Sequence, residues 1–546
     1  MSVARSSLIM ASGTIISRVL GFVRAVLLAA MIGVTTNAAD AFGVANQLPN
    51  NVYAIIAGGV LNAILVPQLV KARSHADGGA GYINRLLTMA IVVFGGITVV
   101  ATIAAPILVD IYTSGWSPAH LALATAFAYW CLPQLFFYAI YSMLGEVLNA
   151  RGHFGPFMWA PVLNNVVGLV GMVAYIVIFG VDPTGKTTVA LWTGSQSTLL
   201  AGSATLGVAA QAVILFYFWR RIGIHYKPNF QWRGFGMAPA LKAGSWTLAM
   251  VLVTQVAGIF QSSVASSSVA GRGHGDVASV AASGIAWLIF MLPHSVATVS
   301  LATVYFTRIS VHVHEGRIED VKTDLRDGLR IVGLISILAA TALIILAYPI
   351  SRVFVGEYSA TMSLAKVLIG FMVGLLPFSL GFFMQKSFYA LEDTKTPFYI
   401  TVLQSVIYIA GALMIQQFVD PIHRTAALAY LTSGSVLVQA VLAFIVLRRR
   451  IGNFSKGVTG SLLRFLLAAA ISGVAGKFAL DAIGGNGMGH FAVRSVTTAV
   501  LACGFVGIVI LIVFVAALWA IRAPEFALLT EATKPVLSKV RGIIKR

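Results

Sequence analysis

The chain has 546 residues, of which 58% are hydrophobic and only 10% are charged. An ordinary soluble domain carries about 25% charged residues, so the composition excludes a soluble multidomain protein. The formal net charge of +19 would suggest a nucleic-acid partner in a soluble protein. In a membrane protein, however, basic residues first report which side of the membrane a loop lies on, so no nucleic-acid partner is expected.

Apolar stretches recur along the whole chain, and each is long enough to cross a hydrocarbon core about 30 Å thick as a helix. They predict an all-α integral membrane protein with 14 transmembrane helices. The first stretch is interpreted as an uncleaved span, because Arg18 and Arg24 interrupt it as they would not interrupt a signal peptide. The predicted spans cover residues 6–34, 40–70, 84–112, 119–149, 157–181, 198–220, 242–269, 277–307, 328–355, 362–391, 397–419, 425–447, 458–482 and 493–521.

The basic residues are distributed unevenly between alternate connecting segments. With the N-terminus placed inside, the inside segments hold 28 of the 37 Lys and Arg residues and the outside segments hold seven. Cytoplasmic loops are enriched in Lys and Arg. The distribution therefore predicts that both termini are cytoplasmic.

An internal repeat divides the predicted spans. Leu48-Pro49 matches Leu292-Pro293, and Leu132-Pro133 matches Leu376-Pro377, both at an offset of 244 residues; GEVLNARGHFGPF (145–157) also resembles KSFYALEDTKTPF (386–398). Two six-helix units in the same orientation should be related by an axis along the membrane normal and should enclose a central cavity. The predicted domains are an N-lobe (1–222), a C-lobe (223–451), two extra helices (452–521) and a basic tail (522–546).

Two arginines in the first span are the clearest functional candidates. A charge at the centre of a transmembrane helix costs at least about 2.5–3.5 kcal/mol, so Arg18 and Arg24 favour a functional cavity. Each could instead extend to the interface or pair with a carboxylate. Glu146 and Lys386 lie near the inner ends of their spans, where either interpretation applies equally.

Polar residues are concentrated in several spans of the first half. Individually, such residues are more often contacts between helices than ligand contacts. Together they suit a water-filled cavity. They are Asn46, Gln47, Asn50, Asn51, Asn62, Gln134, Asn149, Asn164, Asn165, Gln255 and Gln261.

Three further patterns are interpreted as structural. The segment 180–187, GVDPTGKT, fits the P-loop pattern but lies in a predicted outer loop, so no ATP site is expected. His312, His314 and Glu315 could ligate a metal, but neighbouring Arg and Asp residues favour a solvated charged face. Cys131 and Cys503 lie far apart in apolar segments and are expected to be packing residues. No cofactor, metal site or catalytic residue is predicted.

Specific sequence strings resemble the MurJ (MviN) family of lipid II flippases, in the superfamily that also contains MATE drug exporters. They are SRVLGFVRAVLLAAMIG (17–33), DAFGVANQLPNNVYAIIAGGVLNAILVPQL (40–69), NARGHFGPFMWAPVLNN (149–165) and FYALEDTKTPF (388–398). The resemblance implies a V-shaped, MATE-like pair of six-helix lobes. It also implies a cationic cavity for a diphosphate and sugar headgroup, and a groove for the lipid tail beside the last two helices.

The resemblance also implies roles for individual residues. Ser17, Arg18, Gly21, Arg24 and Asp40 match family positions linked to function. We expect three groups of site residues. The first is a substrate-binding set, which includes two residues of the LPNN string; the second contains hinge positions; the third contains further cavity residues. The substrate-binding set is Ser17, Arg18, Arg24, Asp40, Asn50 and Asn51, the hinges are Gly21, Pro49 and Pro161, and the further cavity residues are Glu146, Asn165, His294 and Lys386.

Several positions depart from the family pattern. Ala25 stands where the family often has an acid, Tyr53 and Ala54 where it often has an arginine, and Gly58 where it often has a glutamate. The eighth span, AWLIFMLPHS, lacks the usual arginine and offers only His294. Headgroup contacts are therefore expected to be redistributed in this chain.

The predicted function is to move the headgroup of a lipid-linked diphosphate precursor, lipid II, from the inner to the outer leaflet of a bacterial inner membrane. Alternating access, driven by the membrane potential, is the expected mechanism, with the coupling ion left open. Membrane lipids and cell-wall synthesis proteins are further candidate partners. The alternatives are a MATE-like or polysaccharide-precursor exporter, a membrane-embedded transferase acting on lipid-linked substrates, and a scaffold.

The tail combines basic and apolar residues. Residues 522–546 contain six Lys or Arg together with Phe526, Leu528, Leu529, Leu537, Val540, Ile543 and Ile544. Such a segment is typical of an amphipathic helix on an anionic membrane surface.

Overall fold

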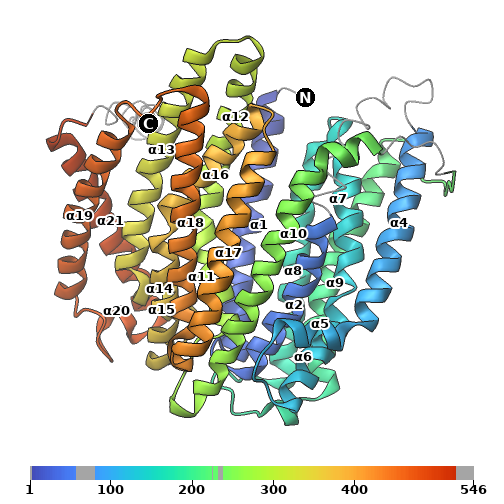
Figure 1. The fold of residues 1–546 in the computed structure, drawn as a ribbon. Helices are drawn as coiled ribbons and strands as arrows, with labels where there is room; N and C mark the ends of the chain where they lie inside the picture. The colour runs from blue at the N-terminus through green and yellow to red at the C-terminus, as the bar shows by residue number, and fades with distance from the viewer. Residues whose placement is uncertain (1–2, 57–79, 224, 232–237, 524–546) are drawn as a thin grey trace, which may run out of the picture. The chain divides into compact units, whose positions relative to one another are not determined.

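The computed structural model describes residues 3–56, 80–223, 225–231 and 238–523, and within these it contains helices and no strand (Figure 1). The predicted all-α class is confirmed. The predicted amphipathic tail lies outside the described residues from position 524 onward, as do Asn62, Gly58 and the second half of the predicted second span.

The first of two compact units comprises residues 1–285 and 408–425. Its N-terminal part runs from the first helix to a 3-10 segment that follows α10. The elements are α1 (Val3–Ile32), α2 (Asn37–Ile56), α4 (Ala80–Ile103), α5 (Ala105–Tyr112), α6 (Pro118–Cys131), α7 (Gln134–Ala150), α8 (Phe154–Phe179), η2 (Val189–Leu191), α9 (Gly194–Arg221), α10 (Ala238–Ser266) and η3 (Ser267–His274).

The second unit comprises residues 286–407 and 426–546. Three helices, α11, α17 and α18, run through both units, because the boundaries fall inside them. The remaining elements are α11 (Val280–Pro293), η4 (His294–Thr298), α12 (Val299–His314), α13 (Ile318–Ile345), α14 (Ala347–Phe354), α15 (Tyr358–Val373), α16 (Leu375–Ala390), α17 (Lys395–Phe418), α18 (Pro421–Ile451), α19 (Val458–Ala482), α20 (Phe491–Arg494) and α21 (Val496–Ala520).

Within the described residues, twelve helices are long and apolar enough to cross a membrane, or up to thirteen if the bent pair of α15 and α16 forms one span. The chain is therefore a multi-pass membrane protein. The predicted number of fourteen is not confirmed. The second predicted span accounts for part of the difference, because α2 can be followed only to Ile56 and the rest of that span lies in the segment that is not described.

Matching helix breaks occur in the two halves of the chain. α5 and α14 each have eight residues and each follow a long helix after one residue of nearly the same conformation, Ala104 (φ −81°, ψ 8°) and Leu346 (φ −91°, ψ 9°). Both short helices contain a proline near their start, which cannot continue the preceding helix because it lacks a backbone N–H. These paired breaks agree with the repeat found in the sequence.

Three of the four Leu-Pro pairs lie at helix irregularities, and the fourth, Leu48-Pro49, lies inside α2. Pro133 separates α6 from α7, and Pro377 lies just after the 42° bend between α15 and α16. Pro293 ends α11 and is followed by the π-helical turn η4. The matching segments 145–157 and 386–398 form the same kind of turn. His153 N donates to Leu148 O (2.8 Å), and Asp393 N donates to Phe388 O (2.9 Å).

Small residues allow α1, α8 and α9 to approach closely. A Cβ added at Gly171 of α8 would lie 2.2 Å from Ser203 Cβ, and one added at Gly207 of α9 would lie 2.5 Å from Asn164 Oδ1. In membranes, helices associate through such close contacts because lipid tails are as apolar as the side chains. This packing fixes the helices that carry the site described below.

The last two long helices, α19 and α21, pack against each other in the second unit (Figure 1). Their contact includes Gly476, where an added Cβ would lie 2.5 Å from Ile510 Cγ1. Residues 458–482 and 496–520 agree closely with the two extra spans predicted from the sequence.

Candidate anion site on the first helix

Three of the predicted site residues lie on one face of α1. Ser17, Gly21 and Arg24 are four and three residues apart, which places them on the same side of a helix. This face packs against α8. An ideal Cβ at Gly21 would lie 3.9 Å from both terminal atoms of the Asn165 side chain, so the glycine is opposite the asparagine.

Asn165 joins α8 to α1 directly. Its Nδ2 donates to the backbone oxygen of Ser17 (2.9 Å) and to the Ser17 hydroxyl oxygen (3.3 Å). A buried or half-buried amide needs such partners, because leaving one unsatisfied costs about 1–3 kcal/mol. The structure therefore brings together two residues, Ser17 and Asn165, that the sequence placed in one cavity.

The guanidinium of Arg24 lies against Gly168, one turn further along α8. A Cβ added at Gly168 would be 3.1 Å from Arg24 Cζ and Nε and 3.2 Å from Nη1. Gly168 itself is buried, and Arg24 is half-buried. The absence of a side chain at residue 168 therefore provides the room that the guanidinium occupies.

A second set of polar groups lies near Arg24. Gln134 Nε2 donates to Asn46 Oδ1 (3.3 Å) and to Thr205 Oγ1 (3.0 Å), and the Tyr138 hydroxyl donates to Gln134 Oε1 (3.2 Å). Tyr138 is close enough to interact electrostatically with Arg24. These contacts join α2, α7 and α9.

A guanidinium inside a span can act as an anion ligand. It is always charged, and its planar N–H groups match the two oxygens of a phosphate or carboxylate. Arg18 is also half-buried on α1. It is adjacent to Ser17 but is turned about 100° around the helix from it, so Arg18 and Arg24 do not share one helix face.

The other predicted residues of the first unit lie on α2 and α7. On α2, Asn50 is exposed and Asn51 is half-buried. Glu146 is half-buried on α7, one turn after Ser142, whose hydroxyl forms a hydrogen bond with the hydroxyl of Tyr53.

His294 and Lys386 lie in the second unit and contact the same ring. The ring centroids of His294 and Phe382 are 5.2 Å apart, and Lys386 Nζ lies 5.6 Å from the Phe382 centroid. His294 is 2% exposed, and its Nδ1 lies 3.1 Å from Ser379 Oγ. The histidine occupies the first position of the π-helical turn η4, a feature often found at functional sites.

The predicted hinge residues lie inside continuous helices. Pro49 is buried within α2, and Pro161 is half-buried within α8, which continues from Phe154 to Phe179. Proline removes one intrahelical hydrogen bond and thereby weakens a helix locally. A hinge role for Gly21, Pro49 and Pro161 stays a prediction.

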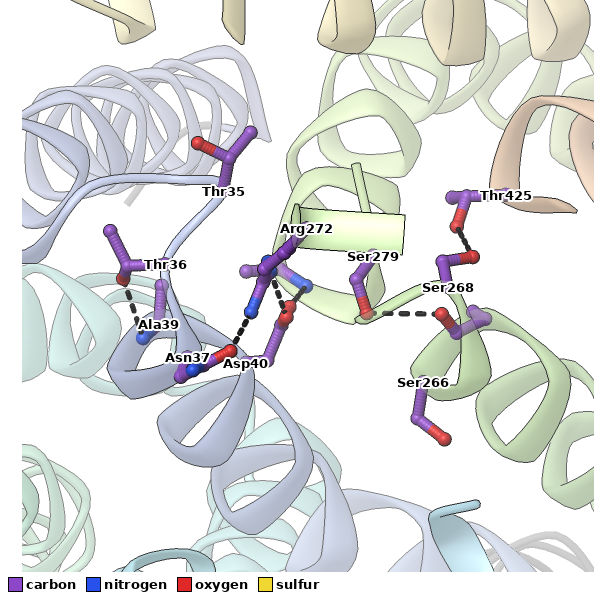
Figure 2. A network of polar contacts seen from close by, with 12 residues as sticks. Thr35, Thr36, Asn37, Ala39, Asp40, Ser266, Ser268, Arg272, Ser279 and Thr425 are labelled. Atoms are coloured by element: carbon purple, nitrogen blue, oxygen red, sulfur yellow. Dashed lines mark hydrogen bonds and ion pairs between the residues drawn. The ribbon is translucent and has the colours of Figure 1, made fainter. Parts of the chain in front are cut away.

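Asp40 does not belong to the face of α1 that carries Ser17, Gly21 and Arg24; it lies in the first turn of α2. Its carboxylate forms an ion pair with Arg272 of η3 and accepts a hydrogen bond from Ala281 N (2.8 Å), as Figure 2 shows in part. Asp40 is 0% exposed. The expected contact of Asp40 with a headgroup would require this ion pair to open.

The P-loop-like segment holds a carboxylate of its own. Asp182 accepts hydrogen bonds from the backbone N–H groups of Lys186 (2.8 Å) and Thr187 (2.7 Å). Burial raises the pKa of Asp182, but the hydrogen bonds from Thr187 and Lys186 outweigh it, so the pKa lies below its ordinary value. Two amides that a phosphate would need are thus already bonded to an ionised side chain.

The HVHE group is divided between separate ion pairs. His312 Nε2 lies 3.4 Å from Asp324 Oδ2, and the same aspartate pairs with Arg308 at 2.6 Å. Glu315 pairs instead with Arg317. This arrangement agrees with the charged face predicted from the neighbouring residues.

Two residues of these networks were missed by the sequence analysis. Gly168 carries no polar group, and only its position three residues after Asn165 could have placed it on the same helix face. Arg272 is one of the seven basic residues in the predicted outside segments, and nothing in the local sequence assigns it a partner. Its pairing with Asp40 joins positions 232 residues apart, which local patterns do not reveal.

Two solved transporter structures have a fold similar to that of this chain. The structure described as "Lipid II flippase MurJ, inward closed conformation" matches with a TM-score of 0.72 at 18% identity, covering 94% of this chain and 99% of that one. A MOP superfamily transporter from Pyrococcus furiosus matches with a TM-score of 0.57 at 17% identity, covering 84% and 96%. At these identities the likeness concerns the fold alone.

Sequence comparison defines the family. The family model for the lipid II flippase MurJ matches residues 28–496, so the chain belongs to the MurJ family. A probable lipid II flippase MurJ from Rhizobium tropici is 29% identical over 82% of each chain, and one from Haemophilus influenzae is 26% identical over 85% of this chain and 90% of its own. The family predicted from the sequence strings is confirmed, and it is a family of transporters.

Proposed function

We propose that this protein moves the headgroup of lipid II, an undecaprenyl-diphosphate-linked peptidoglycan precursor, from the inner to the outer leaflet of a bacterial inner membrane. Membership of the MurJ family supports the substrate class. The observation that carries the proposal is the guanidinium of Arg24, set inside α1 against Gly168. A cation inside a transmembrane helix is costly and usually faces a water-filled cavity or a charged partner, and an anionic headgroup would supply such a partner.

In the proposed mechanism the headgroup enters from the cytoplasmic side, with both chain termini cytoplasmic. Arg24 and Ser17, which lie on one face of α1, receive the diphosphate. Arg18, on another face of α1, and Asn50 and Asn51 of α2 complete the proposed binding set. The lipid tail stays in the bilayer beside α19 and α21. The two sequence repeats then move relative to each other so that the site opens outward, as proposed for alternating access.

The membrane potential supplies the driving force in this proposal. An inside-negative potential contributes about 2.3 kcal/mol per elementary charge per 100 mV. A diphosphate moving outward is therefore favoured, and the emptied cationic site is drawn back inward. No ATP and no cofactor take part, and the coupling ion is left open.

The test is reconstitution of the purified chain with lipid II in liposomes carrying an imposed potential. Headgroup exposure on the outer leaflet should rise with protein and should be faster when the potential favours outward movement of negative charge. If a water-soluble cation moves and lipid II does not, the chain is an exporter of the MATE type. If lipid II is chemically altered, the chain is a transferase. Cell-wall synthesis proteins are proposed partners, which co-purification from membranes would test.

A further inference from the structure

The short segment η3 lies in a network of polar contacts within the first unit. Arg272 of η3 donates to the Asp40 carboxylate and to Asn37 Oδ1, both at the start of α2 (Figure 2). The same carboxylate accepts from Ala281 N at the start of α11. One buried carboxylate thus holds the end of η3 and the beginning of α11 to α2.

Ser266, the last residue of α10, and Ser268 near the start of η3 are held by two other segments. Ser114 N donates to Ser266 Oγ (2.8 Å) and Trp116 Nε1 donates to Ser266 O (3.1 Å), both from the segment between α5 and α6. From the start of α18, the Thr425 hydroxyl lies 2.9 Å from that of Ser268. All these contacts lie on the side of the membrane predicted to face outward.

The network joins segments that belong to different sequence repeats. α2 and the segment between α5 and α6 belong to the first sequence repeat, whereas η3 and α11 belong to the second. Nevertheless, residues 1–285 form one compact unit together with 408–425. Any opening of the outward side between the repeats must therefore break the Arg272–Asp40 pair.

The Arg272–Asp40 ion pair should be strong while the outward side is closed, and separating it should cost less once both side chains reach water. Ion pairs with shared hydrogen bonds are about twice as strong as neutral hydrogen bonds. Breaking a buried pair is costly when one charge stays buried without water. A complete outward opening would expose both charges to water. Separating the two side chains while one of them stays buried would therefore cost more free energy than opening the outward side completely.

We propose that Arg272 and Asp40 form a latch that keeps the outward side closed, which makes Arg272 a positioning residue for transport. This inference rests on the proposed function only in assigning the latch to a transport cycle. The latch itself concerns the contact between the start of α2 and the start of α11, here called the outward seam. Access to this seam can be measured without substrate.

The first experiment measures access to this seam with a reporter cysteine at Gly43. Gly43 lies one turn after Asp40, and an added Cβ would be at an ordinary contact distance, 3.7 Å, from Ala281 Cα. In a chain with both native cysteines replaced by alanine, Gly43→Cys should react slowly with an impermeant thiol reagent. Adding Arg272→Gln or Asp40→Asn should speed the reaction several-fold, Arg272→Lys less so, and the control Lys366→Gln on α15 not at all.

The second experiment closes the seam covalently. Gly43→Cys and Ala281→Cys are expected to form a disulfide on oxidation, because an ideal Cβ at residue 43 would lie only 3.7 Å from Ala281 Cα. Lipid II flipping should stop on oxidation and return on reduction, while the Gly43→Cys single variant is unaffected. Unchanged labelling in both Arg272→Gln and Asp40→Asn, or full transport with the disulfide formed, would overturn the latch. Absence of flipping by the unsubstituted chain, with labelling as expected, would overturn the proposed function and leave the latch standing.

Discussion

Asn165 Nδ2 donates a hydrogen bond to the backbone oxygen of Ser17, 2.9 Å away, and this bond joins α8 to the face of α1 that carries Arg24. Because Gly168 follows Asn165 by one turn, the same surface of α8 both binds α1 and leaves room for the guanidinium. The position of Arg24 therefore depends on two residues of another helix.

Replacing Asn165 by aspartate should test this connection. The aspartate side chain has nearly the same shape, but its carboxylate cannot donate to the Ser17 oxygen, and its charge would compete for Arg24 with an anionic substrate. We expect Asn165→Asp to lower the free energy of unfolding by about 1 kcal/mol, the net value of one hydrogen bond. Thermal unfolding in detergent and lipid II flipping would measure the two effects, and Asn165→Gln, which keeps the donor, should retain more activity.

Adding one methyl group beside Arg24 should move its guanidinium. In Gly168→Ala the new Cβ would be 3.1 Å from Arg24 Cζ, so the side chain must shift by a few tenths of an ångström. Small displacements of a binding group reduce rates, and a roughly two- to tenfold loss of flipping is expected. Gly96→Ala on α4, which has nothing within 4 Å of the added Cβ, is the matched control. Equal activity of the two variants would mean that Arg24 need not occupy this position.

The sequence predicts the helices well because crossing a membrane imposes a length and composition that can be recognised locally. Ser17, Gly21 and Arg24 are predicted as site residues from the family resemblance, and they lie on one face because of helical spacing, whereas Arg18 lies on another. It does not predict the partners of Asp40, because Arg272 and Ala281 reach it from distant segments through tertiary packing. The first compact unit, residues 1–285 with 408–425, likewise depends on long-range contacts. The boundary between the sequence repeats does not indicate where this unit ends.

Asp393 should stabilise the turn between α16 and α17. Its carboxylate accepts from the N–H groups of Lys395 (3.1 Å) and Thr396 (3.0 Å) and pairs with Arg450. Burial raises the pKa of Asp393, but the Thr396 hydrogen bonds and the Arg450 charge outweigh it and lower the pKa below its ordinary value. Asp393→Asn should therefore lower the free energy of unfolding by about 1.5–3 kcal/mol at neutral pH.

The pH dependence of this contribution follows from the direction of the shift. A group with a lowered folded-state pKa stabilises the protein above its unfolded pKa, about 3.9 for aspartate, and loses the effect as pH falls through the folded value. The difference in melting temperature between the wild type and Asp393→Asn should thus be largest near neutral pH and shrink below about pH 4. The exposed neighbour Glu392, changed to Gln, should show no such difference. A constant difference across this range would contradict the ionic interpretation.

Thiol labelling should establish the topology. Lys186 lies exposed in the loop between α8 and α9, and Glu319 lies exposed at the start of α13. If the positive-inside distribution is correct, Lys186→Cys should react with an impermeant thiol reagent in intact spheroplasts. Glu319→Cys should react only after the membrane is permeabilised. The opposite pattern would reverse the predicted orientation of both termini.

Arg24 should be required for transport and not for folding. A charge-assisted contact contributes about 1.5–3 kcal/mol, so Arg24→Ala should slow lipid II flipping roughly ten- to hundredfold. Melting temperature and expression should change little, because removing a cation from a half-buried site removes a desolvation cost as well as its contacts. Flipping by purified protein in liposomes, measured beside thermal unfolding, separates the two effects.

The kind of cation should matter as much as its presence. Arg24→Lys should retain part of the activity, because an ammonium attracts phosphate but cannot bind two of its oxygens in one plane. Arg221→Ala is the control: this exposed arginine at the end of α9 lies 4.8 Å over the ring of Tyr217 and has no place in the proposed site. If Arg24→Ala flips lipid II as fast as the Arg221→Ala control, then Arg24 is a structural residue and the anion site beside Gly168 must be abandoned.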